Sequence, residues 1–192
     1  MHLLVDSTGL KLCGKGEWLL EKHGTATRRS WRMLHLGVDA ETGRIVAAKD
    51  VDDASQAGPL LDQVEGPLAS FTGDGAYDQD GVTSNVTERH PEAAIIVPLR
   101  ANAVPSDTAA IAPTQRDCHL QHIAKHGRMA WQAASGYTKR ARAETGMSRF
   151  KQVIGNGLRS HTDERLRTEV GVAVHVLNRM LDLGRPNSVR IA

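Results

Sequence analysis

The stretch SWRMLHLGVDAETGRIVAAKDV, residues 30–51, contains two strand-like runs on either side of a short turn. The runs at 30–39 and 43–51 are rich in apolar and β-branched residues, and the AETG that joins them ends in glycine. Two such runs separated by a short turn that contains glycine are typical of an antiparallel hairpin. We therefore predict a β-hairpin over residues 30–51.

The rest of the chain alternates between strand-like and helix-like patterns. Short apolar runs predict a buried strand at 2–6, ahead of the hairpin, and two more strands at 69–74 and 93–99. The Ala- and Pro-rich stretch 101–114 is predicted as a loop. Helical spacing and capping residues, among them Ser55 and Ser160, predict helices at 55–64, 78–90, 115–131 and 137–151, and from near 160 to 183.

This order of elements is that of a mixed α/β fold of the ribonuclease H-like kind. Three strands are followed by a helix, a strand, a helix and a strand, and then by helices only. We expect a mixed sheet flanked by helices, with a helical C-terminal third. The pattern indicates no boundary between domains, so residues 1–192 are expected to form one domain.

Composition indicates a cytoplasmic globular protein and argues against a membrane protein. The 192 residues carry a net charge of +2 and 40% of them are hydrophobic, but no apolar run approaches the length of a bilayer span. The N-terminus has no basic region and meets Asp6, unlike a signal peptide. The two cysteines, Cys13 and Cys118, form no CxxC motif, as expected of a protein in a reducing compartment.

Basic residues are concentrated in two regions of the chain. Eight Lys or Arg against three Asp or Glu lie between Lys139 and Arg167, and Arg28, Arg29 and Arg32 form a second cluster. Such concentrations bind phosphate because each neutralised phosphate releases counterions. Clustered bases are also ordinary solvated surface, so charge alone does not identify a nucleic-acid-binding protein.

Two aspartates are predicted where parallel strands of a sheet would bring them together. Asp6 and Asp74 end the first and fourth predicted strands, and a turn containing glycine follows each. Residues at such strand ends stand at the rim of the sheet, where α/β folds place their sites. Neighbouring carboxylates repel each other unless a cation lies between them, and Mg²⁺ favours carboxylate oxygens. The alternative is that both aspartates only form turns.

A third carboxylate, Glu144, lies inside a basic helical segment. On an α-helix with 100° per residue, a stripe about 60° wide contains four residues: Tyr137, Arg140, Glu144 and Lys151. Glu144 would complete a two-metal site, with Arg140 and Lys151 holding phosphate oxygens. The alternatives are that Glu144 only pairs with Arg140 one turn earlier, and that Tyr137 is an aromatic residue at the edge of the core.

The spacing of this stripe matches a family motif, Tyr-x2-Arg-x3-Glu-x6-Lys, at every position. Together with VDSTGLK around Asp6 and GDGAYD around Asp74, it resembles the DDE transposases of bacterial insertion sequences. The resemblance covers about residues 3–188 and includes SWRMLHLGVDAETG and VLNRMLDLGRPNS. It implies a catalytic domain for DNA transposition.

The resemblance also implies roles for individual residues. It makes Asp6, Asp74 and Glu144 a catalytic triad that binds Mg²⁺, with Mn²⁺ as a substitute, for DNA strand cleavage and strand transfer. The expected partner is double-stranded DNA at the element ends and at the target, and a homodimer is left open. The motif assigns phosphate contacts to Arg140 and Lys151, and an auxiliary role to Tyr137.

Two departures from the family pattern leave other functions open. Members usually carry a DNA-binding segment ahead of the first catalytic aspartate; this segment is absent here, so an N-terminally truncated chain is expected. Gly146, two residues after Glu144, is expected to loosen the placement of that carboxylate, because glycine weakens a helix. The alternatives are a catalytically inactive DNA-binding remnant and a ribonuclease H-like nuclease that cuts DNA without joining it.

Three histidines form a separate group of candidate metal ligands. His119, His122 and His126 recur on one predicted helix face beside Cys118, and both residue types bind zinc. The sequence supplies no second cluster of ligands to complete such a site. A polar helix face near DNA is therefore the preferred interpretation.

Overall fold

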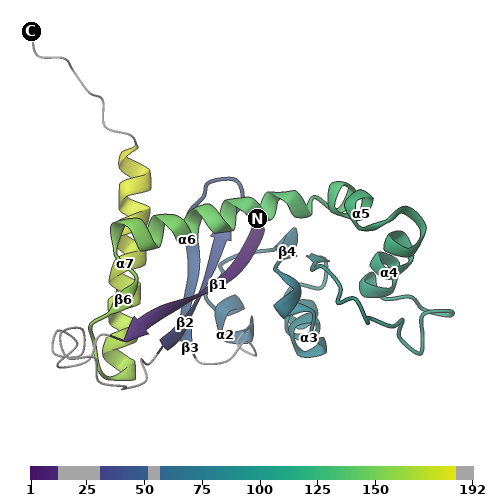
Figure 1. The fold of residues 1–192 in the computed structure, drawn as a ribbon, viewed down its shortest axis with the longest axis horizontal. Coiled ribbons are helices and arrows are strands. Elements are labelled where there is room, and N and C mark those ends of the chain that lie inside the picture. The colour runs from purple at the N-terminus through teal and green to yellow at the C-terminus, as the bar shows by residue number, and fades with distance from the viewer. Residues whose placement is uncertain (13–30, 52–56, 185–192) are drawn as a thin grey trace, which may run out of the picture.

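The computed structural model describes residues 1–12, 31–51 and 57–184 (Figure 1). The strands in this part of the chain are β1 (His2–Leu12), β2 (Trp31–Asp39), β3 (Ile45–Val51), β4 (Ser70–Thr72), β5 (Ala94–Ile96) and β6 (Gly157–Leu158). The α-helices are α2 (Ala57–Leu61), α3 (Asp80–Arg89), α4 (Gln115–His126), α5 (Arg128–Ser135), α6 (Ala141–Val153) and α7 (Asp163–Leu183). Two 3₁₀ helices lie at Gly75–Tyr77 and Tyr137–Arg140. The predicted cluster residues Arg28 and Arg29 and the predicted cap Ser55 lie outside the described residues.

The sheet is built around β1. The strand order is β3-β2-β1-β4-β5, and β6 pairs with the C-terminal end of β1. The predicted hairpin is confirmed: β2 and β3 are antiparallel, and the Asp39 carboxylate closes the turn by accepting a hydrogen bond from the Thr42 hydroxyl at 2.6 Å. Because β4 and β5 run parallel to β1, the sheet is mixed. With helices against it and helices filling the C-terminal part, the predicted ribonuclease H-like α/β fold is confirmed.

β1 is longer than predicted, and Asp6 lies in its middle. The residues after Asp6 were predicted as a turn, but Ser7, Thr8 and Gly9 pair with His35, Leu34 and Met33 of β2. The turn preference of Ser-Thr-Gly is overridden because strand formation depends on the cross-strand partner as much as on the local sequence. The prediction that the first strand ends at Asp6 is therefore wrong.

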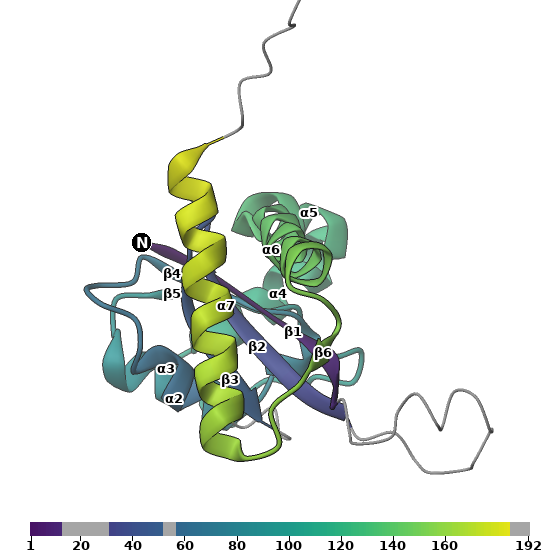
Figure 2. The same cartoon turned by 90° about the vertical axis from the view of Figure 1, so that its left-hand side faces the viewer.

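The side chains of β1 alternate between two hydrophobic cores. Leu3 and Val5 belong to a core shared with α2 and α3, whereas Leu10 belongs to a core shared with α6 and α7. Figure 2 shows α6 on the opposite side of the strands from α2 and α3. Successive residues of a strand point to opposite faces, so Asp6 faces α6 and Ser7 faces the other way.

Helix boundaries differ from the predictions where glycines and caps intervene. The helix predicted over 115–131 is divided at Gly127, whose φ of 84° is a conformation that residues with a Cβ rarely adopt. The last helix begins after Thr162, whose hydroxyl accepts from the backbone N–H of Arg165, and not at the predicted Ser160 cap. Residues 101–114 form no helix or strand, as predicted. None of the described helices is long and apolar enough to cross a membrane.

Candidate active site

Asp6 lies at a gap along one edge of β1. On this edge β4 pairs with residues 2–4 and β6 with residues 11–12, so no described strand pairs there with residues 5–10. The Asp6 carboxylate accepts a hydrogen bond from the backbone N–H of Ser7 at 2.9 Å, and the side chain is 12% exposed. The gap leaves this carboxylate open to groups that come from α6 and from the segment after β4.

Asp74 reaches the same place from the end of β4. The parallel pairing of β1 with β4 places Leu4 opposite Thr72. Asp6 lies two residues after Leu4, and Asp74 lies two residues after Thr72. Asp74 is also the N-cap of the first 3₁₀ helix, where its Oδ1 accepts from the backbone N–H of Ala76 at 2.9 Å. This cap satisfies an N–H group that the helix leaves unpaired, and it fixes one oxygen of the carboxylate.

Glu144 and Arg140 come from a segment that is not one continuous α-helix. Tyr137–Arg140 forms a 3₁₀ helix, and α6 begins only after it. The prediction of one α-helical stripe from Tyr137 to Lys151 is therefore wrong in its first turn, because a 3₁₀ helix has 3.0 residues per turn and not 3.6. Arg140 lies directly before α6, and Glu144 lies in the first turn of α6.

The guanidinium of Arg140 contacts all three carboxylates. Nη1 donates to Glu144 at 2.8 Å, Nη2 donates to Asp6 at 3.0 Å, and Nη2 lies 3.8 Å from Oδ2 of Asp74. The i, i+4 ion pair between Arg140 and Glu144 that the sequence offered as an alternative is present, and the same guanidinium also reaches the two aspartates. Three carboxylates from β1, the segment after β4 and α6 therefore converge on one cation.

Charge around Arg140 changes its proton affinity. Burial alone would lower the pKa of Arg140, but the negative charge of Asp6 and of the other two carboxylates raises it above its ordinary value. The guanidinium thus stays charged. Three carboxylates around one guanidinium leave the site with an excess of negative charge, which attracts further cations and repels phosphate.

The two remaining motif residues lie at the edges of this cluster. Tyr137 is partly buried, and its ring centroid lies 5.5 Å from that of Trp131, a contact expected of an aromatic residue at the edge of the core. Burial raises the pKa of the Tyr137 hydroxyl. Lys151 is exposed on α6, and within the described part of the chain it forms no ion pair with the three carboxylates.

Gly146 brings α6 close to the sheet. The residue is buried, and a Cβ at this position would lie 3.1 Å from Cγ2 of Val38 in β2. A contact this short leaves no room for a larger side chain. The glycine therefore has a packing role that helix propensity does not reveal, because it lets α6 lie close to β2.

No group of three or more His, Cys, Asp or Glu side chains among the described residues is arranged to hold a metal as it stands. At the acidic cluster, Arg140 lies where the carboxylate oxygens converge. The donor set still fits a hard divalent ion, because carboxylate oxygens are the ligands that Mg²⁺ prefers. The predicted histidine ligands are engaged with aromatic neighbours: His119 stacks edge-on against Trp131, and His122 lies beside His126.

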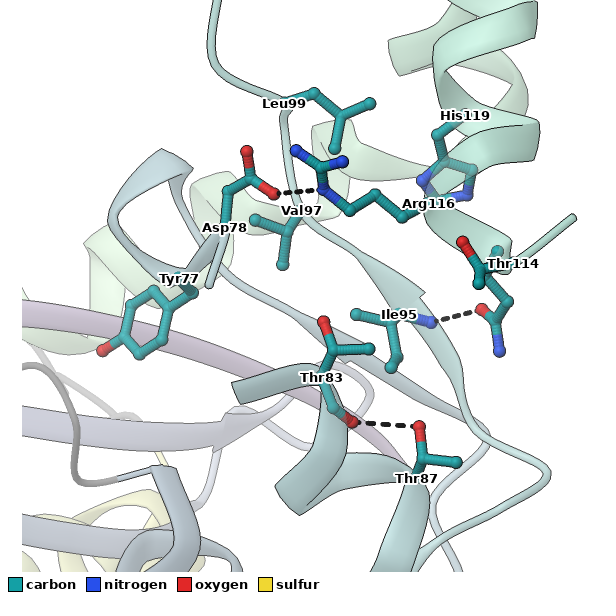
Figure 3. Close-up of a pocket in the computed structure, with 11 residues that line it drawn as sticks. Tyr77, Asp78, Thr83, Thr87, Ile95, Val97, Leu99, Thr114, Arg116 and His119 are labelled. Atoms are coloured by element: carbon teal, nitrogen blue, oxygen red, sulfur yellow. Dashed lines mark hydrogen bonds and ion pairs between the residues drawn. The ribbon is translucent and has the colours of Figure 1, made fainter. Parts of the chain in front are cut away.

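A cavity of about 260 Å³ lies behind the turn that carries Asp74 (Figure 3). Its apolar lining comes from β5 and the segment that follows it, and Arg116 at its rim donates to Asp78 at 3.0 Å. None of the carboxylates that converge on Arg140 lines this cavity. Tyr77 forms one of its walls, and the tyrosine hydroxyl points away from the cavity (Figure 3).

Two buried polar residues beside the cluster were not among the sequence candidates. Tyr77 is 3% exposed and His35 is 4% exposed, and the Tyr77 hydroxyl lies 2.9 Å from Nδ1 of His35. A signal was present in the sequence: Tyr77 follows Asp74 by three residues in GDGAYD, and His35 interrupts an otherwise apolar strand. What the sequence does not show is that β2 aligns His35 opposite Ser7, the neighbour of Asp6.

The geometry agrees with what comparison with known proteins shows. No solved structure matches the chain. A family model described as the transposase DDE domain matches residues 1–179, a range that contains all three converging carboxylates. The resemblance expected from the sequence motifs is thereby confirmed, and it makes transposition the general function. The chain belongs to the transposase DDE domain family.

Proposed function

We propose that Asp6, Asp74 and Glu144 are the catalytic carboxylates of a transposase that cleaves and joins DNA strands with Mg²⁺, or with Mn²⁺ as a substitute. The observation that carries this proposal is the convergence of three carboxylates, from separate parts of the chain, on the single guanidinium of Arg140. Carboxylates cluster in this way at a cost in repulsion, which a fold tolerates where a cation is to be bound.

The three carboxylates would hold the divalent ions, and Arg140 would then lose its present partners. A divalent cation and a guanidinium compete for the same carboxylate oxygens, so they do not lie between Asp6, Asp74 and Glu144 at the same time. Bound metal ions would supply activation of the attacking water or hydroxyl and stabilisation of the leaving oxygen of a phosphodiester. Asp6 is held by the Ser7 N–H and Asp74 by the Ala76 N–H, so each keeps one anchor when Arg140 turns away.

Arg140 would exchange its carboxylate partners for phosphate oxygens of the DNA. A guanidinium binds phosphate through two parallel N–H groups, and Arg140 uses both Nη atoms on carboxylates in the structure. Lys151, exposed farther along α6, would contact the DNA backbone beyond it.

The test compares cleavage with DNA binding in Asp74→Asn. Loss of one charged ligand is expected to abolish cleavage and joining of linear duplex DNA in Mg²⁺, while binding of the same DNA stays within about twofold, because binding depends mainly on Lys and Arg. Asp80→Asn is the matched control, because Asp80 is exposed in the first turn of α3 and lies six residues away; it should cleave as the wild type does. Unchanged cleavage by Asp74→Asn would refute the proposal, and cleaved DNA without joined product from the wild type would identify a nuclease instead.

A further inference from the structure

Tyr77 ties the turn that carries Asp74 to β2. Its side chain extends from the 3₁₀ helix that Asp74 caps, and the hydroxyl lies 2.9 Å from Nδ1 of His35 in β2. His35 in turn lies opposite Ser7 of β1 in the sheet. Figure 3 shows the hydroxyl directed away from the neighbouring cavity, toward the strands. One buried hydroxyl thus joins the Asp74 turn to the strand that pairs with β1 beside Asp6.

The ring of Tyr77 is held as firmly as its hydroxyl. Its centroid lies 6.0 Å from that of Phe71 in β4 and 6.3 Å from that of His35, both edge-on. A Cβ at position 73 would lie 2.9 Å from Cδ2 of the ring, so Gly73 is what allows the ring to fold back over the end of β4. Burial and these ring contacts hold the tyrosine in place while this turn keeps its shape.

This anchor acts on both aspartates from the far side of the sheet. His35 lies opposite Ser7 in the pairing of β2 with β1, and Ser7 and Asp6 are consecutive and point to opposite faces of β1, so the anchor meets the sheet next to the point where Asp6 leaves it. In the described structure the Asp74 carboxylate contacts the Ala76 N–H at 2.9 Å and Arg140 at 3.8 Å, and its backbone carbonyl accepts from the N–H of Tyr77 at 3.0 Å. Arg140 also contacts Asp6 of β1, but Arg140 is the partner that bound metal would displace. Tyr77 supplies a connection to the sheet that does not depend on Arg140.

We propose that Tyr77 is a positioning residue for metal binding, and that its hydroxyl fixes the Asp74 turn against β2, the partner strand of β1, so that the two aspartates present their oxygens together. This inference rests on the proposed function of the acidic cluster. Residues that hold metal ligands in place change metal affinity by about 10- to 100-fold when they are replaced. A purely structural tyrosine would change stability and leave the affinity of the folded protein for metal unchanged.

The experiment measures Mn²⁺ binding to the full chain by calorimetry, well below the unfolding temperature of each variant. Tyr77→Phe keeps the ring and removes the hydroxyl, and we expect its Mn²⁺ affinity to fall about tenfold. His35→Ala removes the partner of the hydroxyl in β2 and should give a loss in the same direction. Asn178→Ala is the matched control, because Asn178 makes two hydrogen bonds to the backbone of Ile45, remote from the cluster; it should lose stability and bind Mn²⁺ as the wild type does.

The outcomes separate the inference from the function on which it rests. If Asp74→Asn loses Mn²⁺ binding while Tyr77→Phe and His35→Ala bind as the wild type does, Tyr77 is not a positioning residue and the metal site stands. If Asp74→Asn itself binds Mn²⁺ as the wild type does, the proposed metal site falls and the role of Tyr77 falls with it. A loss in Asn178→Ala equal to that in Tyr77→Phe would show that general destabilisation is the cause, and would also overturn the inference.

Discussion

At the scale of single residues, Arg140 controls the charge balance of the site. It is the shared partner of Asp6, Asp74 and Glu144, and its own pKa is raised by their charge. The sequence offered its ion pair with Glu144 as an alternative, because i, i+4 pairing is a local property of helices. It did not predict the contact with Asp6, 134 residues away, because that contact depends on how α6 packs on the sheet. The sequence singled out all three carboxylates, and it singled out Arg140 as a phosphate contact but not as the cation between them.

Replacing Arg140 with Gln should make the fold depend on divalent ions. Without metal, the three carboxylates would repel each other unscreened, and we expect the free energy of unfolding to fall by about 1–3 kcal/mol. A divalent ion then meets no competing guanidinium, so Mg²⁺ should raise the unfolding temperature of Arg140→Gln by more than it raises that of the wild type. Thermal unfolding with and without 5–10 mM Mg²⁺, roughly the range that covers weak sites, measures both effects.

Lys151→Gln is the control for this comparison, because it removes a positive charge from the same helix at an exposed position away from the carboxylates. It should unfold like the wild type in both conditions. Equal Mg²⁺-induced shifts in Arg140→Gln and the wild type would mean that the guanidinium and the metal do not compete for the same oxygens.

At the scale of elements, strong local patterns were predicted well and elements that depend on partners were not. The hairpin of β2 and β3 has a clear apolar pattern and a turn, and it is present as predicted. The length of β1 was missed because pairing with β2 carries it through Ser-Thr-Gly. The 3₁₀ turn at Tyr137–Arg140 was missed because helical periodicity does not reveal where a helix tightens. The packing of Gly146 against Val38 was not predicted, because that contact depends on how α6 lies on the sheet.

The close approach of α6 to β2 predicts that Gly146→Leu damages the site through the helix. The side chain would meet Val38, so α6 must shift outward, and overpacking of this kind costs about 1–3 kcal/mol of stability. Glu144 would move with the helix, and we expect weaker Mn²⁺ binding as well as a lower free energy of unfolding. Denaturant unfolding and calorimetry measure the two quantities on the same preparation.

Ser148→Leu provides the matched control on α6, because Ser148 is exposed two residues farther along the helix. It should leave both quantities close to the wild-type values. If Gly146→Leu keeps wild-type affinity for Mn²⁺ while losing stability, the packing of α6 against β2 does not set the position of Glu144.

At the scale of the whole molecule, the fold brings together carboxylates that are distant in sequence. Asp6 lies on the central strand, Asp74 follows its parallel neighbour, and Glu144 lies on the helix that crosses them (Figure 1). The parallel pairing of β1 with β4 places the two aspartates at the same height along neighbouring strands. Asp6 faces α6, because successive residues of a strand point to opposite faces of the sheet. The sequence predicted this architecture because the order of strands and helices restricts the topology. The identity of the cation between the carboxylates is a separate claim, and it is the central one.

The most direct test of that claim is a crystal structure of the full chain grown with Mn²⁺, with anomalous scattering used to locate the metal. We predict anomalous peaks in direct contact with carboxylate oxygens of Asp6, Asp74 and Glu144, with the guanidinium of Arg140 turned away from all three. Crystals with Ca²⁺ in place of Mn²⁺ provide the control, because Ca²⁺ also binds carboxylates but scatters differently at the manganese edge. Arg140 still bridging the three carboxylates in saturating Mn²⁺, with the anomalous peaks elsewhere on the molecule, would contradict the proposed metal site.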